Sequence, residues 1–483
     1  MKRKLAIFLT LGLLLILIPL LANAEIIRSG KCGDNLDWTL DDNLVLTVSG
    51  NGEMNPDSLF PFPTGIKKAI FCEGITSIAK SAFAYLYYNL EEVIIPDSVT
   101  RIGDDAFNGC TNLTKVTGGN NLISIGEMAF DDCINLSEIT ISDSVTTIGF
   151  AAFYNCKSLE SFTFPQSIAS LGNCALKLCT GLKSVTIPQG MTEISEQTFS
   201  GCSGLKNITI PETVTKISEN AFAYCSGLED IVIPQSTTFI GDCAFRDCSS
   251  LTSIVIPDSV TSIGYGAFFN CSALTDIKLP DSLPYLAYGL FGECTSLESI
   301  TIPESVDSIG EAAFEHCTSL ISVIIPPSVK IIYKEAFSLC PALTRITIPK
   351  SVERIEKDAF TGCTNLKEVF YTGDESNKTK MDIHSANRPL TAATWYYRIP
   401  ENLPPLSEMT VLNLPSDLIE IEEEAFANIS CEAIIIPKGC KTIGKKAFAN
   451  CPNLLYVEIP STVTSIADDA FEGSEKAAVI KQK

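Results

Sequence analysis

The sequence predicts an α/β fold, a right-handed solenoid of 23-residue repeats with a parallel sheet on one face and short helices on the other. One phenylalanine recurs every 23 residues, most copies have a proline eleven residues earlier, and a cysteine always follows three residues later. A fixed period of this size indicates stacked units instead of a single globular core. The phenylalanines are Phe107, Phe130, Phe153, Phe199, Phe222, Phe245, Phe268, Phe291, Phe314, Phe337 and Phe360, and Leu176 keeps the spacing.

The first element of each repeat is a strand, as the repeat at residues 251–271 illustrates. Ile254 and Ile256 alternate with a residue that points the other way, which is typical of a strand with one buried face. Pro257 has no N–H for a ladder, so we expect the strand to end there. Val260 and Ile263 then predict a second, shorter extended stretch that crosses the core.

The second half of the repeat predicts a short helix that presses one face inward. Ala267, Phe268 and Cys271 have the spacing of such a face. Acidic pairs such as Asp104 and Asp105 precede this segment. Negative charge stabilises a helix N-terminus, and this explains the pairs more simply than acid/base chemistry does. We therefore expect a structural core that includes Phe107, Phe130, Phe153, Phe222, Phe268, Phe314, Phe360, Cys110, Cys202 and Cys271.

The N-terminus predicts export. Lys2, Arg3 and Lys4 precede an apolar run over residues 5–21, and the run is followed by Ala22-Asn23-Ala24. This order is that of a secretory signal peptide, here residues 1–24. The alternative is an uncleaved membrane anchor, since the run is about the minimum length that spans a bilayer. No second apolar segment follows, so we expect no membrane insertion after cleavage.

The formal net charge of −22 bears on partners. Phosphate backbones are repelled by such an excess of acid, so nucleic acid is not an expected partner.

The chain has nineteen cysteines, which in an exported protein would normally indicate disulfides. Thirteen of them occupy one repeat position, where a thiol would face inward and donate weakly to a backbone carbonyl. Stacked side chains point the same way, which disfavours disulfide geometry, so we expect free structural thiols. Cys174 and Cys243 lie elsewhere in the repeat and are predicted to be the more reactive ones. No C-x-x-C pair occurs, so no metal site is expected.

The repeat pattern L-x-x-I-x-I-P-x-S-V-T-x-I-G-x-x-A-F-x-x-C resembles the BspA-like, or Treponema-type, class of leucine-rich repeats. Residues 29–52 are similar to the segment that precedes the repeats in these proteins, and residues 369–397 resemble their long variant repeat. The predicted organisation is therefore a capping segment at 25–65, a leucine-rich-repeat array at 66–370, a variant repeat and linker at 371–410, and a second short block at 411–483.

Chemistry of a catalytic kind is not expected. The chain has two histidines, His316 and His384, and neither lies beside an obvious nucleophile. An enzyme would need His384, Asp382 and Asp374 of the irregular stretch to act together, and these are few and loosely placed. We predict no enzyme activity, no cofactor and no metal.

The remaining candidate is the outward side of the first strand, which we call the sheet face. Its residues form a broad, gently polar strip that suits a macromolecular partner, although threonine also simply suits exposed strand positions. The sheet face comprises Thr140, Thr163, Thr186, Thr209, Val232, Val255, Lys278, Thr301, Arg345 and Thr347.

The resemblance implies an exported protein, secreted or at the cell surface, that binds macromolecules through its solenoid surface, with adhesion as the usual role. The expected partner is an extracellular protein or glycan. A structural envelope or matrix protein that self-associates without a saturable ligand is the alternative, because fold alone does not define function.

Overall fold

The computed structural model describes residues 24–55, 63, 65–84, 88–397, 411–414, 418–474 and 477–481. The predicted signal peptide, apart from Ala24, and residues 398–410 of the predicted variant repeat and linker lie outside these residues. The chain divides into two compact units, Met1–Ile277 and Lys278–Lys483, and each is described by itself. Within the described residues, no helix combines the length and the apolarity that crossing a membrane requires.

The first unit begins with a three-stranded antiparallel segment, β1 (Ile26–Gly33), β2 (Leu36–Asp41) and β3 (Val45–Gly50). Strand β3 then pairs in parallel with β5 (Lys68–Phe71), the first strand of the stack. Trp38, Leu46 and Val48 of this segment are buried. The segment thus covers the apolar end that the first repeat would otherwise expose.

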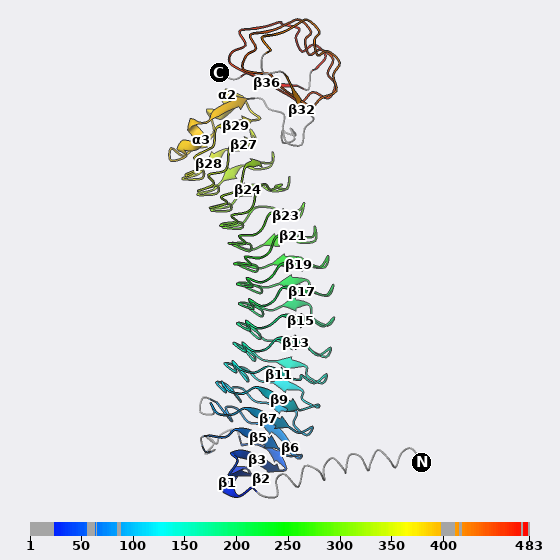
Figure 1. Ribbon diagram of the computed structural model, residues 1–483, viewed down its shortest axis with the longest axis vertical. Helices are drawn as coiled ribbons and strands as arrows, with labels where there is room; N and C mark the ends of the chain where they lie inside the picture. Colours follow the sequence, from blue (N-terminus) through cyan, green and yellow to red (C-terminus); the bar gives the residue numbers. More distant parts are fainter. Residues whose placement is uncertain are drawn as a thin grey trace, which may run out of the picture. The chain divides into compact units, whose positions relative to one another are not determined.

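The repeats of the first unit form a stack of rungs in which most strand residues pair with the residue 23 positions later (Figure 1). In the first repeat the spacing is 24, as between Lys68 and Glu92. Two parallel ladders run along the stack. The first contains β5, β7 (Glu92–Ile95), β9 (Lys115–Gly118), β11 (Glu138–Ile139), β13 (Ser161–Thr163), β15 (Ser184–Thr186), β17 (Asn207–Thr209), β19 (Asp230–Val232) and β21 (Ser253–Val255). The second contains β4 (Gly52–Glu53), β6 (Ile75–Ile78), β8 (Arg101–Ile102), β10 (Ser124–Ile125), β12 (Thr147–Ile148), β14 (Ser170–Leu171), β16 (Glu193–Ile194), β18 (Lys216–Ile217), β20 (Phe239–Ile240) and β22 (Ser262–Ile263).

The second unit repeats this plan. Its first ladder has β25 (Ser322–Ile324), β27 (Arg345–Ile348), β29 (Glu368–Tyr371) and β31 (Thr394–Tyr397), with β23 (Asp276–Lys278) at the unit boundary. Its second ladder has β24 (Ser308–Ile309), β26 (Ile331–Ile332), β28 (Arg354–Ile355) and β30 (Asp382–Ile383). A later block contains β32 (Val411–Asn413), β33 (Glu420–Ile421), β34 (Ala433–Ile435), β35 (Thr442–Ile443), β36 (Tyr456–Ile459), β37 (Ser465–Ile466) and β38 (Ala478–Lys481).

The stacked parallel strands of a right-handed solenoid are confirmed, but the predicted short helices are wrong. The two helices of the described residues, α2 (Glu375–Lys378) and α3 (Arg388–Ala392), lie in the variant repeat. The segment around each Ala-Phe pair, such as residues 104–109, is a run of turns, and we call the side formed by these segments the turn face. The acidic pairs therefore do not lie at helix N-termini.

Left-handed backbone explains why the turn face is not helical. Asp105 has φ 53° and Gly109 has φ 74°, and equivalent positions of other rungs are also left-handed. The N–H groups of Asp105, Phe107 and Gly109 consequently point to the next rung, where each donates to a carbonyl oxygen over 2.8 Å. An α-helix needs those donors for its own carbonyls four residues back, so bonding between rungs replaces helix formation.

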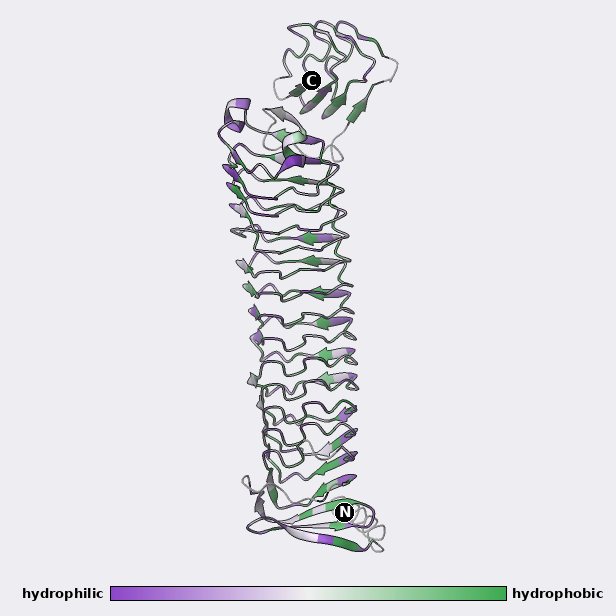
Figure 2. Cartoon of the chain, turned by 90° about the vertical axis from the view of Figure 1, so that its left-hand side faces the viewer, coloured by the Kyte–Doolittle hydropathy of each residue, from purple (hydrophilic) through white to green (hydrophobic). Residues whose placement is uncertain are grey.

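The core of each rung is formed by the periodic residues. All the phenylalanines and cysteines predicted as core are fully buried. The rings stack on one another along the chain; those of Phe222 and Phe245, for example, have centroids 5.4 Å apart and are nearly parallel. Figure 2 shows strands that are mostly hydrophobic with hydrophilic residues where many of them begin, as expected for a strand with one buried side.

Hydroxyl groups join the rungs, a feature that the sequence analysis missed. Ser236 Oγ donates to the carbonyl oxygen of Val214 over 2.8 Å, and Ser259 Oγ donates to that of Thr237 over 2.7 Å. Thr238 Oγ1 donates likewise to Thr215. The signal was present in the recurring Ser and Thr of the motif P-x-S-V-T, because a residue type that recurs at one position has the same neighbour in every rung.

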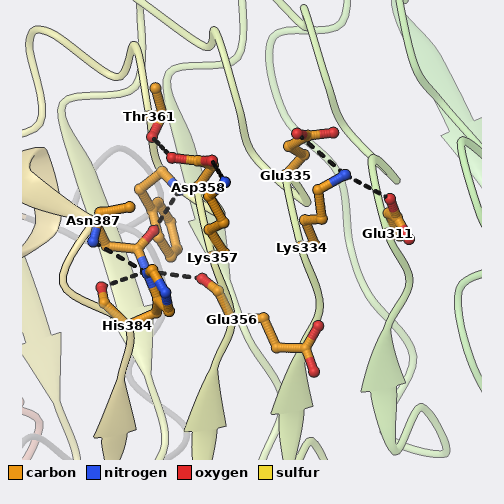
Figure 3. A network of polar contacts seen from close by, with 11 residues as sticks. Glu311, Lys334, Glu335, Glu356, Lys357, Asp358, Thr361, His384 and Asn387 are labelled. Carbon is orange, nitrogen blue, oxygen red and sulfur yellow. Dashed lines mark hydrogen bonds and ion pairs between the residues drawn. The ribbon is translucent and has the colours of Figure 1, made fainter.

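Asn387 closes the regular rungs of the second unit where the variant repeat follows them (Figure 3). Its Oδ1 accepts a hydrogen bond from the N–H of Phe360 over 3.0 Å, which in other rungs bonds to a main-chain carbonyl. Its Nδ2 donates to the carbonyl oxygens of Glu356 and His384. The fully buried amide therefore replaces backbone groups that the irregular segment does not supply.

Candidate interaction surface

The sheet face of the first unit is built by strands β13 to β21. In each strand the middle side chain is buried and the two flanking side chains are exposed. This alternation follows from the pleat, because successive side chains point to opposite sides of the sheet. Thr186 pairs in register with Thr163 and Thr209, and Thr209 pairs with Val232, so one exposed row crosses successive rungs.

The structure places the predicted sheet-face residues as follows. Val232 and Val255 are 71% and 60% exposed, which is high for apolar side chains. Arg345 and Thr347 are half-buried in the longer strand β27. Thr140 is exposed but follows β11, which ends at Ile139, so it lies outside a strand. The others, Thr163, Thr186, Thr209, Lys278 and Thr301, are exposed.

Ion pairs between rungs flank the exposed row. Lys183 lies 2.8 Å from Glu160, and Lys206 lies 2.9 Å from Glu229. The hydrogen bond and the charge of Glu229 raise the pKa of Lys206. Exposed pairs of this kind contribute little to stability, so their main effect is to fix charges at the edge of the surface. Beside the second pair a hollow of about 320 Å³ opens over residues 206–209 and 229–232.

Groups that could perform catalysis are scattered or occupied. Asp374 accepts a hydrogen bond from the N–H of Asn377 and caps α2. His384 Nδ1 accepts from the N–H of Ala386 over 3.2 Å. Both side chains thus serve the local backbone. Among the described residues no group of three or more His, Cys, Asp or Glu side chains is arranged to hold a metal ion.

The cysteines of the repeat column are buried free thiols. As predicted, they donate to backbone carbonyls; Cys133 Sγ, for example, lies 3.2 Å from the oxygen of Phe107. Burial raises the pKa of Cys110 to about 12. Cys174, predicted to be one of the more reactive cysteines, is instead buried, since it is 7% exposed and burial raises its pKa. Cys243 is half-buried, and Cys72, which the sequence analysis did not single out, is half-buried as well.

The stacked parallel strands, the 23-residue register and the buried leucine and isoleucine columns define a leucine-rich-repeat protein. A model of the BspA-type leucine-rich repeat region, six copies long, matches residues 76–202, 124–252, 238–367 and 405–482. These matches cover most of the chain, so the protein belongs to the BspA-type leucine-rich-repeat family. The model describes a repeat region and not a catalytic domain. No curated protein matches the chain.

Two solved structures with TM-scores of 0.50 or more have the same fold. A leucine-rich repeat protein from Bacteroides ovatus is 26% identical with a TM-score of 0.58, and the match covers 76% of this chain and 98% of that one. A leucine-rich repeat protein from Eubacterium ventriosum is 26% identical with a TM-score of 0.50, over 69% and 94% of the two chains. A leucine rich cell surface protein from Faecalibacterium prausnitzii is 29% identical with a TM-score of 0.45, over 75% and 99%.

Proposed function

We propose that the protein is an exported, non-enzymatic binding protein, secreted or held at the cell surface, and that it holds an extracellular protein or glycan on its sheet face. The observation that carries the proposal is the exposure of Val232 and Val255 in neighbouring strands of an otherwise polar surface. Apolar side chains in such a position are typical of the contact region of an interface. The role as an adhesin rests on family membership and on the predicted signal peptide.

The surface suits a large partner better than a small one. The exposed row continues across the rungs at one strand spacing per repeat, and the hollow over residues 206–209 and 229–232 is lined by an ion pair. Small-molecule sites bury most of their ligand in a concave pocket, whereas protein interfaces are broad. A broad face with fixed charges at its edge therefore resembles a protein interface more than a small-molecule site.

A binding screen of the purified chain against arrayed extracellular proteins and glycans tests the proposal. For a saturable hit, Val232→Asp together with Val255→Asp should weaken binding at least about tenfold, because both changes place charge in the contact region. Tyr224→Asp is the matched control, since Tyr224 is 51% exposed on the turn face. Charge reversal of Lys278 and Arg345 tests the sheet face of the second unit.

Two outcomes would contradict the proposal. Equal weakening by Tyr224→Asp and by the valine changes would move the contact away from the sheet face. The absence of any saturable ligand, together with self-association that rises with protein concentration, would favour the structural envelope or matrix protein instead.

A further inference from the structure

The turn face of the first unit contains a pocket of about 430 Å³ that is separate from the sheet face. Four successive rungs contribute to its wall. Hydrogen bonds between rungs hold it in place: Met128 N–H donates to Phe150 O over 2.8 Å, and Asp132 N–H donates to Tyr154 O over 3.0 Å. The lining residues are Met128, Asp131, Phe150, Ala151, Tyr154, Asn173, Cys174, Lys177, Glu196 and Gln197.

At one end of this pocket the side chains are polar and form hydrogen bonds with one another. Glu196 accepts hydrogen bonds from Gln197 Nε2 over 2.9 Å and from Asn173 Nδ2 over 3.2 Å. Lys177 Nζ donates to Gln197 Oε1. The polar side chains of this end thus bond to one another.

The other end is different. Met128, Ala151, Phe150 and Tyr154 surround a single carboxylate, that of Asp131. Phe150 is 40% exposed, so part of its ring is open to a ligand. The Oδ1 atom of Asp131 is buried and has no hydrogen-bond partner. A buried acceptor without a partner costs stability, so its presence in a native fold requires an explanation.

The chemistry around Asp131 favours a particular ligand. Aromatic faces attract cations, and the negative charge of a half-buried carboxylate attracts a positive group nearby. Apolar walls with one carboxylate match a side chain that has an aliphatic stem and a positive head, which is the description of lysine and arginine. The net charge of −22 favours a basic partner in addition.

A later part of the turn face already has a cation packed against an aromatic ring. The guanidinium of Arg246 lies 4.7 Å from the ring centroid of Phe269, one rung later on the turn face. Arg246 and Phe269 occupy the repeat positions that Asp131 and Tyr154 occupy in earlier rungs. A cation is therefore sterically compatible with an aromatic ring at this place in the repeat.

We propose that the pocket formed by Asp131, Phe150 and Tyr154 binds a lysine or arginine side chain of a partner polypeptide. This inference goes beyond the proposed role of the sheet face and does not depend on it.

The pH dependence of binding follows from the same groups. Burial is the largest cause that raises the pKa of Asp131 to about 6, and the negative charges of Asp132 and Asp105 raise it further. A hydrogen bond from the Asp132 backbone lowers this pKa in part. Protonation removes the charge that attracts the cation, so affinity should fall as the pH decreases through about 6. Lys177, Glu196, Tyr154 and Cys174 also face the pocket. The Asp131→Asn variant distinguishes Asp131 from these groups, because its affinity should not fall as the pH decreases through about 6.

The test is a titration of the purified chain with short blocked peptides that contain one lysine, one arginine or one norleucine, followed by ligand-detected NMR and calorimetry at about pH 8. The lysine and arginine peptides should bind, and the norleucine peptide should not. Asp131→Asn and Phe150→Ala should each weaken binding at least about tenfold. Asp143→Asn is the matched control, since it removes one exposed carboxylate outside the pocket.

Three results would overturn the proposal. These are no binding of either cationic peptide to the unaltered chain, equal binding of the norleucine peptide, and unchanged binding by Asp131→Asn. Binding of the free diamine cadaverine without binding of the peptides would show that the pocket takes a small amine, and this too would contradict a polypeptide partner. Misfolding is not expected to obscure the result, because Asp131 is half-buried and Asp131→Asn keeps the size and shape of the side chain.

Discussion

The thiol of Cys225 donates a hydrogen bond to the main-chain oxygen of Phe199, one rung earlier, with 3.1 Å between Sγ and oxygen. The same bond recurs in neighbouring rungs, as between Cys248 and Phe222. Each cysteine therefore fills a small buried space and joins two rungs. This double role explains why the residue recurs at one position without forming disulfides.

Replacement of Cys225 tests this role. Cys225→Ala should lower the free energy of unfolding by about 1 to 2 kcal/mol, because it removes a hydrogen bond and leaves a small cavity. Cys225→Ser should cost less, since Ser474 occupies the equivalent position in the last block and donates to Phe448 O over 2.7 Å. Urea denaturation measures both. An alanine variant as stable as the parent chain would show that the thiol bond contributes nothing.

The thiols should differ sharply in reactivity. Cys72 and Cys243 are half-buried, whereas the other seventeen cysteines are buried. A thiol reagent at about pH 8 should therefore label at most these two in the native chain and all nineteen in denaturant. Burial raises the pKa of Cys225 to about 12, which keeps the native thiol protonated at that pH. Rapid labelling of a column cysteine in the native chain would contradict its burial.

The phenylalanine column should dominate stability. Phe268 is fully buried, and its ring stacks 5.5 Å from that of Phe245. Phe268→Ala should cost about 3 to 5 kcal/mol, because it removes a large buried ring and leaves a cavity. Tyr265→Ala, at a side chain that is 57% exposed, should change stability by less than about 1 kcal/mol. Chemical denaturation compares the two, and an unchanged midpoint for Phe268→Ala would disprove the core assignment.

Two glycines form a matched pair for the left-handed backbone. Gly201 has φ 76°, and a Cβ there would come within 2.5 Å of Leu178 Cδ2. At Gly190 the nearest atoms to an added Cβ are 3.8 Å away. Gly201→Ala should therefore cost about 1 to 2 kcal/mol, whereas Gly190→Ala should be neutral or slightly stabilising. Thermal unfolding of both variants measures this, and equal effects would show that left-handed geometry is not the cause.

The amide of Asn387 should stabilise the rungs that it closes. Asn387→Ala would leave the buried N–H of Phe360 and the carbonyl of Glu356 without their partner, at a cost of about 2 to 3 kcal/mol. Asn387→Asp keeps the acceptor for Phe360 and loses both donors. Hydrogen exchange should therefore show loss of protection at the Phe360 amide in the alanine variant and less loss in the aspartate variant. Full protection in Asn387→Ala would contradict the bond.

Much of the fold could be predicted from the sequence because each rung has the same residue pattern and therefore the same local structure. Ile254, Ile256 and Pro257 indicate a strand and its end within six residues. The spacing of Phe245 and Phe268 then dictates that identical residues stack. The family follows from the same pattern, and a match over most of the chain confirms it.

The turn face could not be predicted in this way. Ala267, Phe268 and Cys271 have helical spacing, yet the left-handed residues beside them direct N–H groups to the next rung. Those left-handed positions contain residues as different as Asp105, Met128 and Ala151, so no residue type marks them. The backbone conformation there is decided by bonding to the neighbouring rung, which local propensity does not contain.

The sequence by itself determined the period, the buried columns and the family of this protein, because these depend on residues that recur at a fixed spacing. The tertiary structure alone decided which of the non-recurring residues line a common pocket. Asp131, Phe150 and Tyr154 lie at variable positions of the repeat, so no recurring residue type marks them as a group, although Asp131 and Tyr154 are one period apart. Stacking brings them together, since each residue of a solenoid lies beside the residue one period away.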